Sequence, residues 1–142
     1  MSWNQVEIIL NSYERGFNLI NHEIINQFSE IKNYKIGLLH LFIKHTSASI
    51  SINENADPTV REDLESYFNK FVPENEPYFK HTFEGPDDMP AHLKSTIIGN
   101  SLTVPISNGN LELGTWQGIY LCEHRDSPHI RRIFVTINGQ KK

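Results

Sequence analysis

The stretch Leu102–Ile137, LTVPISNGNLELGTWQGIYLCEHRDSPHIRRIFVTI, decides the fold class of this chain. Its first apolar side chains alternate with polar ones, which is the pattern of a strand with one buried face. Residues 107–110 contain an Asn-Gly pair, the strongest short-range signal of a β-hairpin turn. The partner strand is predicted over residues 111–124, a second turn over 125–129 and a last strand over 130–137. The C-terminal third is therefore predicted to be an antiparallel meander.

Upstream of the meander, strand patterns and helix patterns alternate. A first strand is predicted over residues 6–10. A helix follows over about 21–32, where Asn21 is a suitable N-cap and apolar residues recur at helical spacing. The apolar run 36–43 is interpreted as a buried central strand, although its periodicity alone is also compatible with a helix.

Residues 44–55 have the period of a strand, with apolar side chains on one face and serines on the other. The serine face is equally compatible with an ordinary solvated sheet and with a binding site. Asp57-Pro58 predicts the start of a helix that ends at Pro73, because it places an acidic cap before proline at the first helical position. The buried stripe of this helix is predicted to be Val60, Leu64, Tyr67, Phe68 and Phe71. This order of elements predicts an α+β fold with mainly antiparallel sheets.

Length and composition predict one soluble domain, residues 1–142. The formal net charge of -4 argues against a nucleic-acid partner, which usually meets a basic face. The N-terminus lacks the features of a signal peptide, and no apolar run reaches the roughly 20 residues that a membrane helix needs. The single cysteine, Cys122, excludes an internal disulfide. A cytoplasmic protein without a membrane partner is expected.

Residues 81–94, HTFEGPDDMPAHLK, are the densest group of side chains that could carry chemistry. They include two imidazoles and three carboxylates: His81, His92, Glu84, Asp87 and Asp88. Their glycine and prolines predict an irregular surface segment, with a short helix only after His92, ending near Ile98. On local pattern, a solvated loop and a functional site both remain open.

A metal site is one interpretation of this segment, since imidazole suits zinc, copper, iron or nickel. A catalytic zinc needs about three protein ligands and an open position. The spacing of His81 and His92 is a weak signal, because the chain contains no HExxH and no CxxC motif. It also contains no phosphate-binding glycine loop and no GxSxG elbow. Further along, Gln117, Glu123 and Arg125 would share a strand face and could bind a polar ligand, or Glu123 and Arg125 could form a plain ion pair.

Four segments together resemble the YjbQ family, and the similarity runs nearly end to end. They are RGF at 15–17, HTSASISINENADPTVREDLE at 45–65, HTFEGPDDMPAHLKSTIIGNSLTVPISNGNLELGTWQGIYLCEHR at 81–125, and RRIFVTINGQ at 131–140. The GTWQG and HTSAS-to-INEN blocks are its most specific parts. The resemblance implies a two-sheet, mainly antiparallel sandwich with two main helices, assembled as a homotrimer about a threefold axis.

The resemblance also implies a weak, secondary thiamine-phosphate synthase activity. That reaction joins hydroxymethylpyrimidine diphosphate to a thiazole phosphate and releases pyrophosphate. The partner molecules expected are therefore a small phosphorylated metabolite and further copies of the chain. Two alternatives stay open: a non-catalytic trimer that binds a small anionic metabolite or a metal, and a purely structural trimer.

Carried onto this chain, the family motifs imply a divalent metal, zinc or magnesium, held by His45, His81 and His92. The other site residues expected are Glu54, Glu84, Asp88, Lys94, Gln117 and Arg125. Among them, a carboxylate would act as a base or orient an imidazole, and Lys94 or Arg125 would stabilise a diphosphate leaving group. An unbroken strand would hold His45 about 26 Å from Asn53. A bend in the chain, or a subunit boundary, would be needed to bring the motifs together.

Overall fold

The computed structural model describes residues 1–142 and contains two antiparallel sheets and three α-helices. The strands are β1 (Ser2–Ile9), β2 (Gly16–Leu19), β3 (Tyr34–Ile43), β4 (Ala48–Glu54), β5 (Ser101–Ser107), β6 (Asn110–Leu111), β7 (Gln117–Glu123) and β8 (Arg132–Lys141). The helices are α1 (Asn21–Gln27), α2 (Pro58–Phe71) and α3 (Asp88–Ile98), with a 3-10 turn η1 (Ser29–Asn33) after α1. The expected α+β class with two mainly antiparallel sheets is confirmed.

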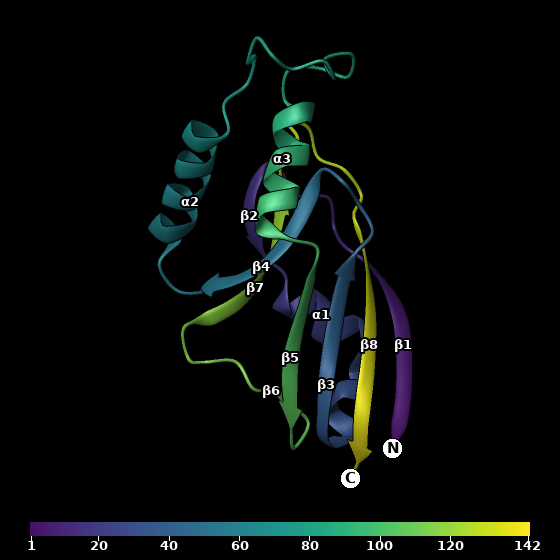
Figure 1. Ribbon diagram of the computed structural model, residues 1–142. Coiled ribbons are helices and arrows are strands. Elements are labelled where there is room, and N and C mark those ends of the chain that lie inside the picture. The colour runs from purple at the N-terminus through teal and green to yellow at the C-terminus, as the bar shows by residue number, and fades with distance from the viewer.

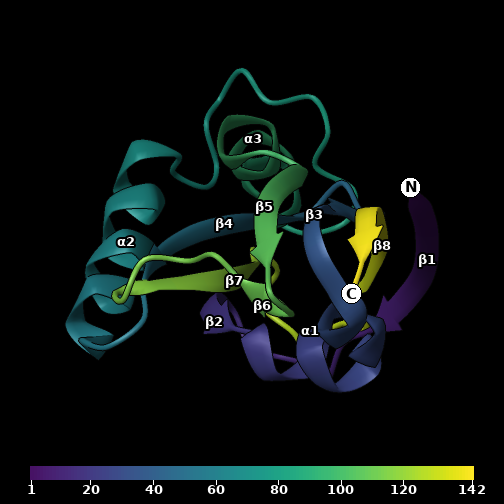
Figure 2. The ribbon, with the colours of Figure 1, turned by 90° about the horizontal axis from the view of Figure 1, so that it is seen from below.

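One sheet has five strands in the order β1-β8-β3-β5-β6, and the other has three in the order β2-β7-β4. Both termini lie at one end of the molecule, and the long connection between α2 and α3 crosses the opposite end (Figure 1). In the same view α1 lies behind the larger sheet, and no helix covers the front of that sheet. Figure 2, seen from below, shows α2 and α3 together on the side of the smaller sheet.

The smaller sheet is buried on both faces. A main core fills the space between the two sheets, with Leu41 and Val135 from the larger sheet and Ile50 and Leu121 from the smaller. A second cluster lies on the other face of the smaller sheet, where Leu64 and Phe68 of α2 and Ile98 of α3 pack against Phe17, Tyr120 and Cys122. The serine face of β4 is therefore covered by helices, and Ser49 is fully buried.

Two predicted elements are interrupted in the structure. The helix predicted over about 21–32 stops at Gln27 and continues as η1. Asn21 does not cap it, because its side-chain oxygen accepts a hydrogen bond from the backbone N–H of Ile119, at 2.7 Å. The strand predicted over 111–124 ends at Leu111, and β7 begins at Gln117 in the other sheet. The chain changes sheets within this run, and the alternation of side chains cannot show such a change.

The predicted hairpin turn and the predicted start of α2 are confirmed, but the buried stripe of α2 differs from the prediction. The Asn-Gly turn joins β5 and β6, and both central residues have positive φ, 49° at Asn108 and 79° at Gly109. Helix α2 begins as expected, because the Asp57 carboxylate accepts a hydrogen bond from the N–H of Thr59 at 2.9 Å. Its stripe is narrower than predicted, since Tyr67 and Phe71 are exposed and stack on each other. No helix combines the length and the apolar character needed to cross a bilayer.

Candidate metal centre

The candidate site is built on the first turns of α3, which begins earlier than the sequence predicted. Pro90 does not break the helix because it lies in the first turn, where its missing N–H would have no helical partner. The helix therefore starts at Asp88, and His92 lies one turn later on the same face. His81 reaches this face from the loop before the helix.

Two imidazoles converge on one buried carboxylate. The Nε2 atom of His81 lies 2.7 Å from Oδ2 of Asp88, and Nε2 of His92 lies 3.0 Å from the same oxygen. The ring centroids of the two histidines are 5.3 Å apart. Asp88 is 1% exposed. One ligand atom from each of the three residues lies within 4.8 Å of the others.

Arg125 holds the carboxylates and the loop in place. Its Nη1 lies 2.9 Å from Oδ1 of Asp88, its Nε donates to Asp87 at 2.8 Å, and its Nη2 donates to the carbonyl of Glu84 at 3.1 Å. Burial acts to raise the pKa of Asp88. The hydrogen bond with His81 and the charges of His92 and Arg125 outweigh burial, so this pKa lies below its ordinary value. Asp88 is therefore an anion at neutral pH.

The hydrogen bonds of His92 determine which ring nitrogen is free. Its Nδ1 lies 2.9 Å from the carbonyl oxygen of Thr46, which can only accept, so Nδ1 carries a proton. In a neutral ring, Nε2 then has a lone pair, and this lone pair faces the Asp88 carboxylate. Two acceptors that face each other repel unless a proton or a cation lies between them. The arrangement can therefore hold either an imidazolium or a metal ion.

A buried ion pair lies next to Ser47, the residue after Thr46, and sequence reasoning missed its cationic member, Arg131. Arg131 binds Glu123 through two hydrogen bonds, of 2.6 Å and 2.5 Å, and donates to the backbone oxygen of Ser47 at 3.2 Å. Glu123 thus pairs with Arg131, and the ion pair suggested between Glu123 and Arg125 does not form. No local pattern could have found this pair, because Arg131 follows the turn after β7 and reaches back across it.

The remaining expected site residues lie in other places within the chain. His45 is not part of the cluster, and its Nε2 accepts a hydrogen bond from the backbone N–H of Arg132 at 2.8 Å. Lys94 is buried on another face of α3 and donates to Asn69 of α2 at 2.7 Å. Burial and the charge of Arg15 lower the pKa of Lys94. Neither residue reaches the two imidazoles as the sequence suggested.

Glu54 and Gln117 lie at the opposite end of the β4–β7 pair from the cluster. They are cross-strand partners, and Ala48 and Glu123 pair at the other end. The six steps along the strand from Ala48 to Glu54 separate the two ends by about 20 Å. The Glu54 carboxylate accepts from the N–H of Ala56, and Gln117 accepts from the N–H of Gly114. Glu84, by contrast, lies in the loop next to the cluster, where Arg125 holds its carbonyl.

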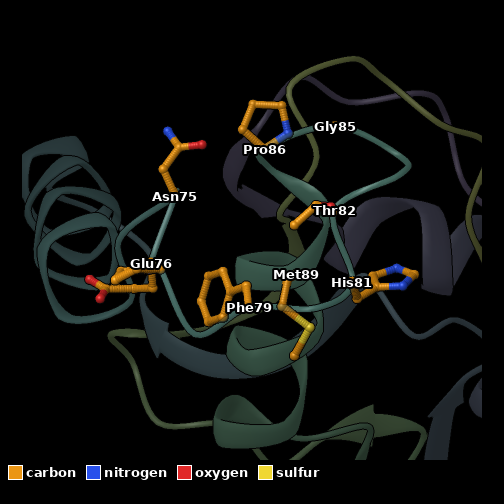
Figure 3. Close-up of a pocket in the computed structure, with 9 residues that line it drawn as sticks. Asn75, Glu76, Phe79, His81, Thr82, Gly85, Pro86 and Met89 are labelled. Carbon is orange, nitrogen blue, oxygen red and sulfur yellow. The ribbon is translucent and has the colours of Figure 1, made fainter.

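Hollows flank the cluster on two sides. One, of about 430 Å³, lies under the loop before α3, where Phe79 and Met89 form part of the wall (Figure 3). In this view the ring of His81 points away from Met89. The other, of about 500 Å³, lies between His45 and His92 and contains no hydrophobic side chain. A ligand of small size therefore has room on either side.

The fold and the cluster define a class: a two-sheet α+β protein with a His₂Asp group at the start of a helix. The family described as "UPF0047 protein YjbQ-like" matches residues 6–140. The chain belongs to this family.

Relatives and solved structures agree with this assignment. The UPF0047 protein YjbQ of Escherichia coli O157:H7 is 49% identical over 138 residues, which cover 97% of this chain and 99% of that protein. The UPF0047 protein YugU of Bacillus subtilis is 42% identical over 103 residues, which cover 72% of this chain and 75% of that protein. A crystal structure of a YjbQ/UPF0047 protein from Clostridium acetobutylicum, 37% identical, has a TM-score of 0.82 and covers 94% of this chain and 99% of that chain.

Proposed function

We propose that this protein is a metal-assisted transferase with a weak thiamine-phosphate synthase activity, and that His81, Asp88 and His92 hold its metal ion. The observation that carries the proposal is the convergence of two ring nitrogens and one buried carboxylate oxygen on a common point. The reaction would join hydroxymethylpyrimidine diphosphate to a thiazole phosphate and release pyrophosphate.

The residues present fit zinc better than magnesium. Two imidazole nitrogens and one carboxylate oxygen are the ligand set of several catalytic zinc sites, which leave a position open. Magnesium prefers oxygen ligands alone. The lone pair of His92 that faces Asp88 supports a cation at this point. Arg125 binds the second oxygen of Asp88, and metal-binding carboxylates usually have such a hydrogen-bond partner outside the metal's own ligands. Asp88 takes the position that the sequence had suggested for His45.

The residues of the chain prepare the site before any ligand arrives. Thr46 fixes the proton of His92 on Nδ1, and Arg125 keeps Asp88 charged and oriented. When bound, the metal would act as a Lewis acid that neutralises charge on the leaving diphosphate. The attacking ring nitrogen of the thiazole brings a lone pair and no proton, so this step needs no base; Glu84 lies in the loop beside the cluster, where Arg125 binds its backbone carbonyl.

One observation favours the alternative, a protein that binds a small anionic metabolite or a metal without efficient catalysis. The two cations expected to stabilise the diphosphate are engaged by the protein itself. Arg125 contacts Asp87 and Asp88, and Lys94 is buried against Asn69. Preorganised cations that stabilise the negative charge developing on a departing diphosphate supply a large part of catalysis when it leaves a carbon atom, so the arrangement supports at most a slow enzyme.

The open face of the larger sheet supports a homotrimer as the assembled form. Trp3, Ile36, Leu38 and Phe42 expose apolar side chains on this face, with Leu38 53% exposed. The side-chain oxygen of Asn138, a cross-strand partner of both Trp3 and Leu38, is buried without a hydrogen-bond partner. Apolar patches of this kind mark contact surfaces between proteins.

The proposal is tested by zinc titration and turnover of Asp88→Asn and His92→Ala, with His22→Ala as the control. His22 is exposed on α1, outside the cluster and outside the open face of the larger sheet. Loss of one of three ligands is expected to weaken zinc binding by at least about 10-fold, since even outer partners contribute 10-fold to 100-fold. Turnover should fall with it. Unchanged zinc affinity and turnover in both variants would overturn the proposal, and lost binding with turnover always at background would favour the binding alternative.

A further inference from the structure

The hydrogen bonds of His45 determine its protonation state. Its Nε2 accepts from the backbone N–H of Arg132, and a backbone amide can only donate. Nε2 therefore carries no proton, which excludes the imidazolium form. In the neutral ring the proton lies on Nδ1. Burial and the charge of Arg131 lower the pKa of His45, in agreement with a ring that stays neutral.

The Nδ1–H group of His45 has no partner in the protein. No hydrogen bond engages it, and it is not among the buried polar atoms that lack a partner, so it is accessible. The ring of His45 forms one wall of the hollow of about 500 Å³, and His92 forms another. His45 thus presents one accessible donor beside the His81–Asp88–His92 cluster, and it has no free lone pair with which to bind a metal.

Two hydroxyls of this hollow offer acceptors, and Thr46 and Asn100 line it as well. The hydroxyl of Ser95 donates to the carbonyl of Ala48 at 2.9 Å, and the hydroxyl of Thr96 donates to the carbonyl of His92 at 2.9 Å. Both hydroxyl protons are thereby committed, and the two oxygens remain as acceptors. No side chain with a fixed charge lines the hollow. Helix α3 ends there at Ile98, and the partial negative charge of a helix C-terminus disfavours anions.

We propose that this hollow is a subsite for an uncharged group that pairs an acceptor atom with an N–H or O–H donor, as an aminopyrimidine does. His45 donates to the acceptor atom, and Ser95 and Thr96 accept from the donor. The charged part of a substrate then faces the cluster at His92, which lines the hollow and belongs to the cluster. This inference deepens the proposed function and rests on it only for the location of the charged part.

The first measurement is the tautomer of His45 by ¹⁵N NMR at neutral pH in the full-length protein. We expect a protonated Nδ1 and an unprotonated Nε2.

The second measurement is a titration of the protein with 4-amino-5-hydroxymethyl-2-methylpyrimidine, an uncharged probe. We expect a shift of the His45 resonances, and a dissociation constant raised by at least about 5-fold in His45→Phe, because a lost hydrogen bond costs about 1 kcal/mol. His45→Gln, which can both accept and donate, should recover part of the affinity.

His22→Phe, on the exposed surface of α1, is the matched control and should bind the probe as the wild type does. Thr96→Val provides a second test if His45→Phe fails to fold, because Thr96 is exposed and its loss removes one acceptor. Equal probe affinity in all variants, no binding to the wild type, or a metal-bound or doubly protonated His45 would overturn the subsite. Failure of zinc binding with intact probe binding would overturn the proposed function and leave the subsite standing.

Discussion

His124 is a buried histidine whose surroundings lower the pKa of its ring. It is 2% exposed, and its Nε2 lies 2.8 Å from the hydroxyl of Ser49. Burial, with the nearby charges of Lys94 and Arg15, lowers the pKa of His124 to about 3. The native protein therefore keeps this ring neutral through the range in which an exposed histidine takes up a proton.

Stability is predicted to fall as the pH drops below about 6.5. In that range the unfolded chain binds a proton at His124 and the native chain does not, so the free energy of unfolding decreases by up to about 1.4 kcal/mol per pH unit. Urea unfolding between pH 7.5 and 5 measures the slope. This range avoids the titration of Asp87 and Asp88, whose pKa values lie below the ordinary range. His124→Gln should show a smaller slope, and an identical slope would contradict the prediction.

At the scale of elements, the local signals that proved reliable come from single residues that cap a helix or restrict the backbone. The cap and proline at Asp57-Pro58 start α2, and the Asn-Gly pair turns the chain between β5 and β6. Signals based on apolar periodicity were less reliable where the chain changes partners. The run after Leu111 reads as one strand, yet its two parts belong to different sheets. The sequence predicts that Pro90 interrupts regular structure, but in the first turn of α3 proline is compatible with the helix.

Gly109→Ala is predicted to destabilise the hairpin. A Cβ at this position would lie 2.8 Å from the carbonyl oxygen of Lys32, and the backbone has a φ of 79°. The left-handed conformation alone costs an alanine about 1–2 kcal/mol, and the close contact adds to it. Asn108→Gly is the control, because it keeps a positive φ accessible and removes no packing. Urea unfolding should show a loss for the first variant only. Equal stability of Gly109→Ala and the wild type would contradict this account of the turn.

At the scale of the whole molecule, the layers explain why some polar residues are buried and some apolar ones are exposed. The smaller sheet lies between the main core and the two helices, so polar residues such as Ser49 and Glu123 lie in the interior and need internal partners. The larger sheet has one face without a covering element, and there Trp3 is 68% exposed and Ile36 59% exposed. The isolated chain thus has an incompletely covered surface.

Leu38→Asp is predicted to disrupt the proposed homotrimer, because it would place a charge at the centre of the apolar face. Size-exclusion chromatography with light scattering should give the mass of a trimer for the wild type and a smaller mass for the variant. Tyr67→Asp is the matched control, since Tyr67 is 61% exposed on α2, away from this face. A monomeric wild type, or a variant with the same mass as the wild type, would contradict the assignment of this face.

The sequence by itself determined the α+β class, the start of α2, the hairpin turn and the segment 81–94 as the place to look for chemistry. These depend on periodicity, caps and turn residues, which act within a few positions along the chain. Only the tertiary structure decided which partners meet: Asp88 with the two imidazoles, Arg131 with Glu123, and His45 with a backbone amide. Contacts between residues far apart in the chain depend on how strands and helices pack, and no local pattern encodes which distant residue a side chain meets.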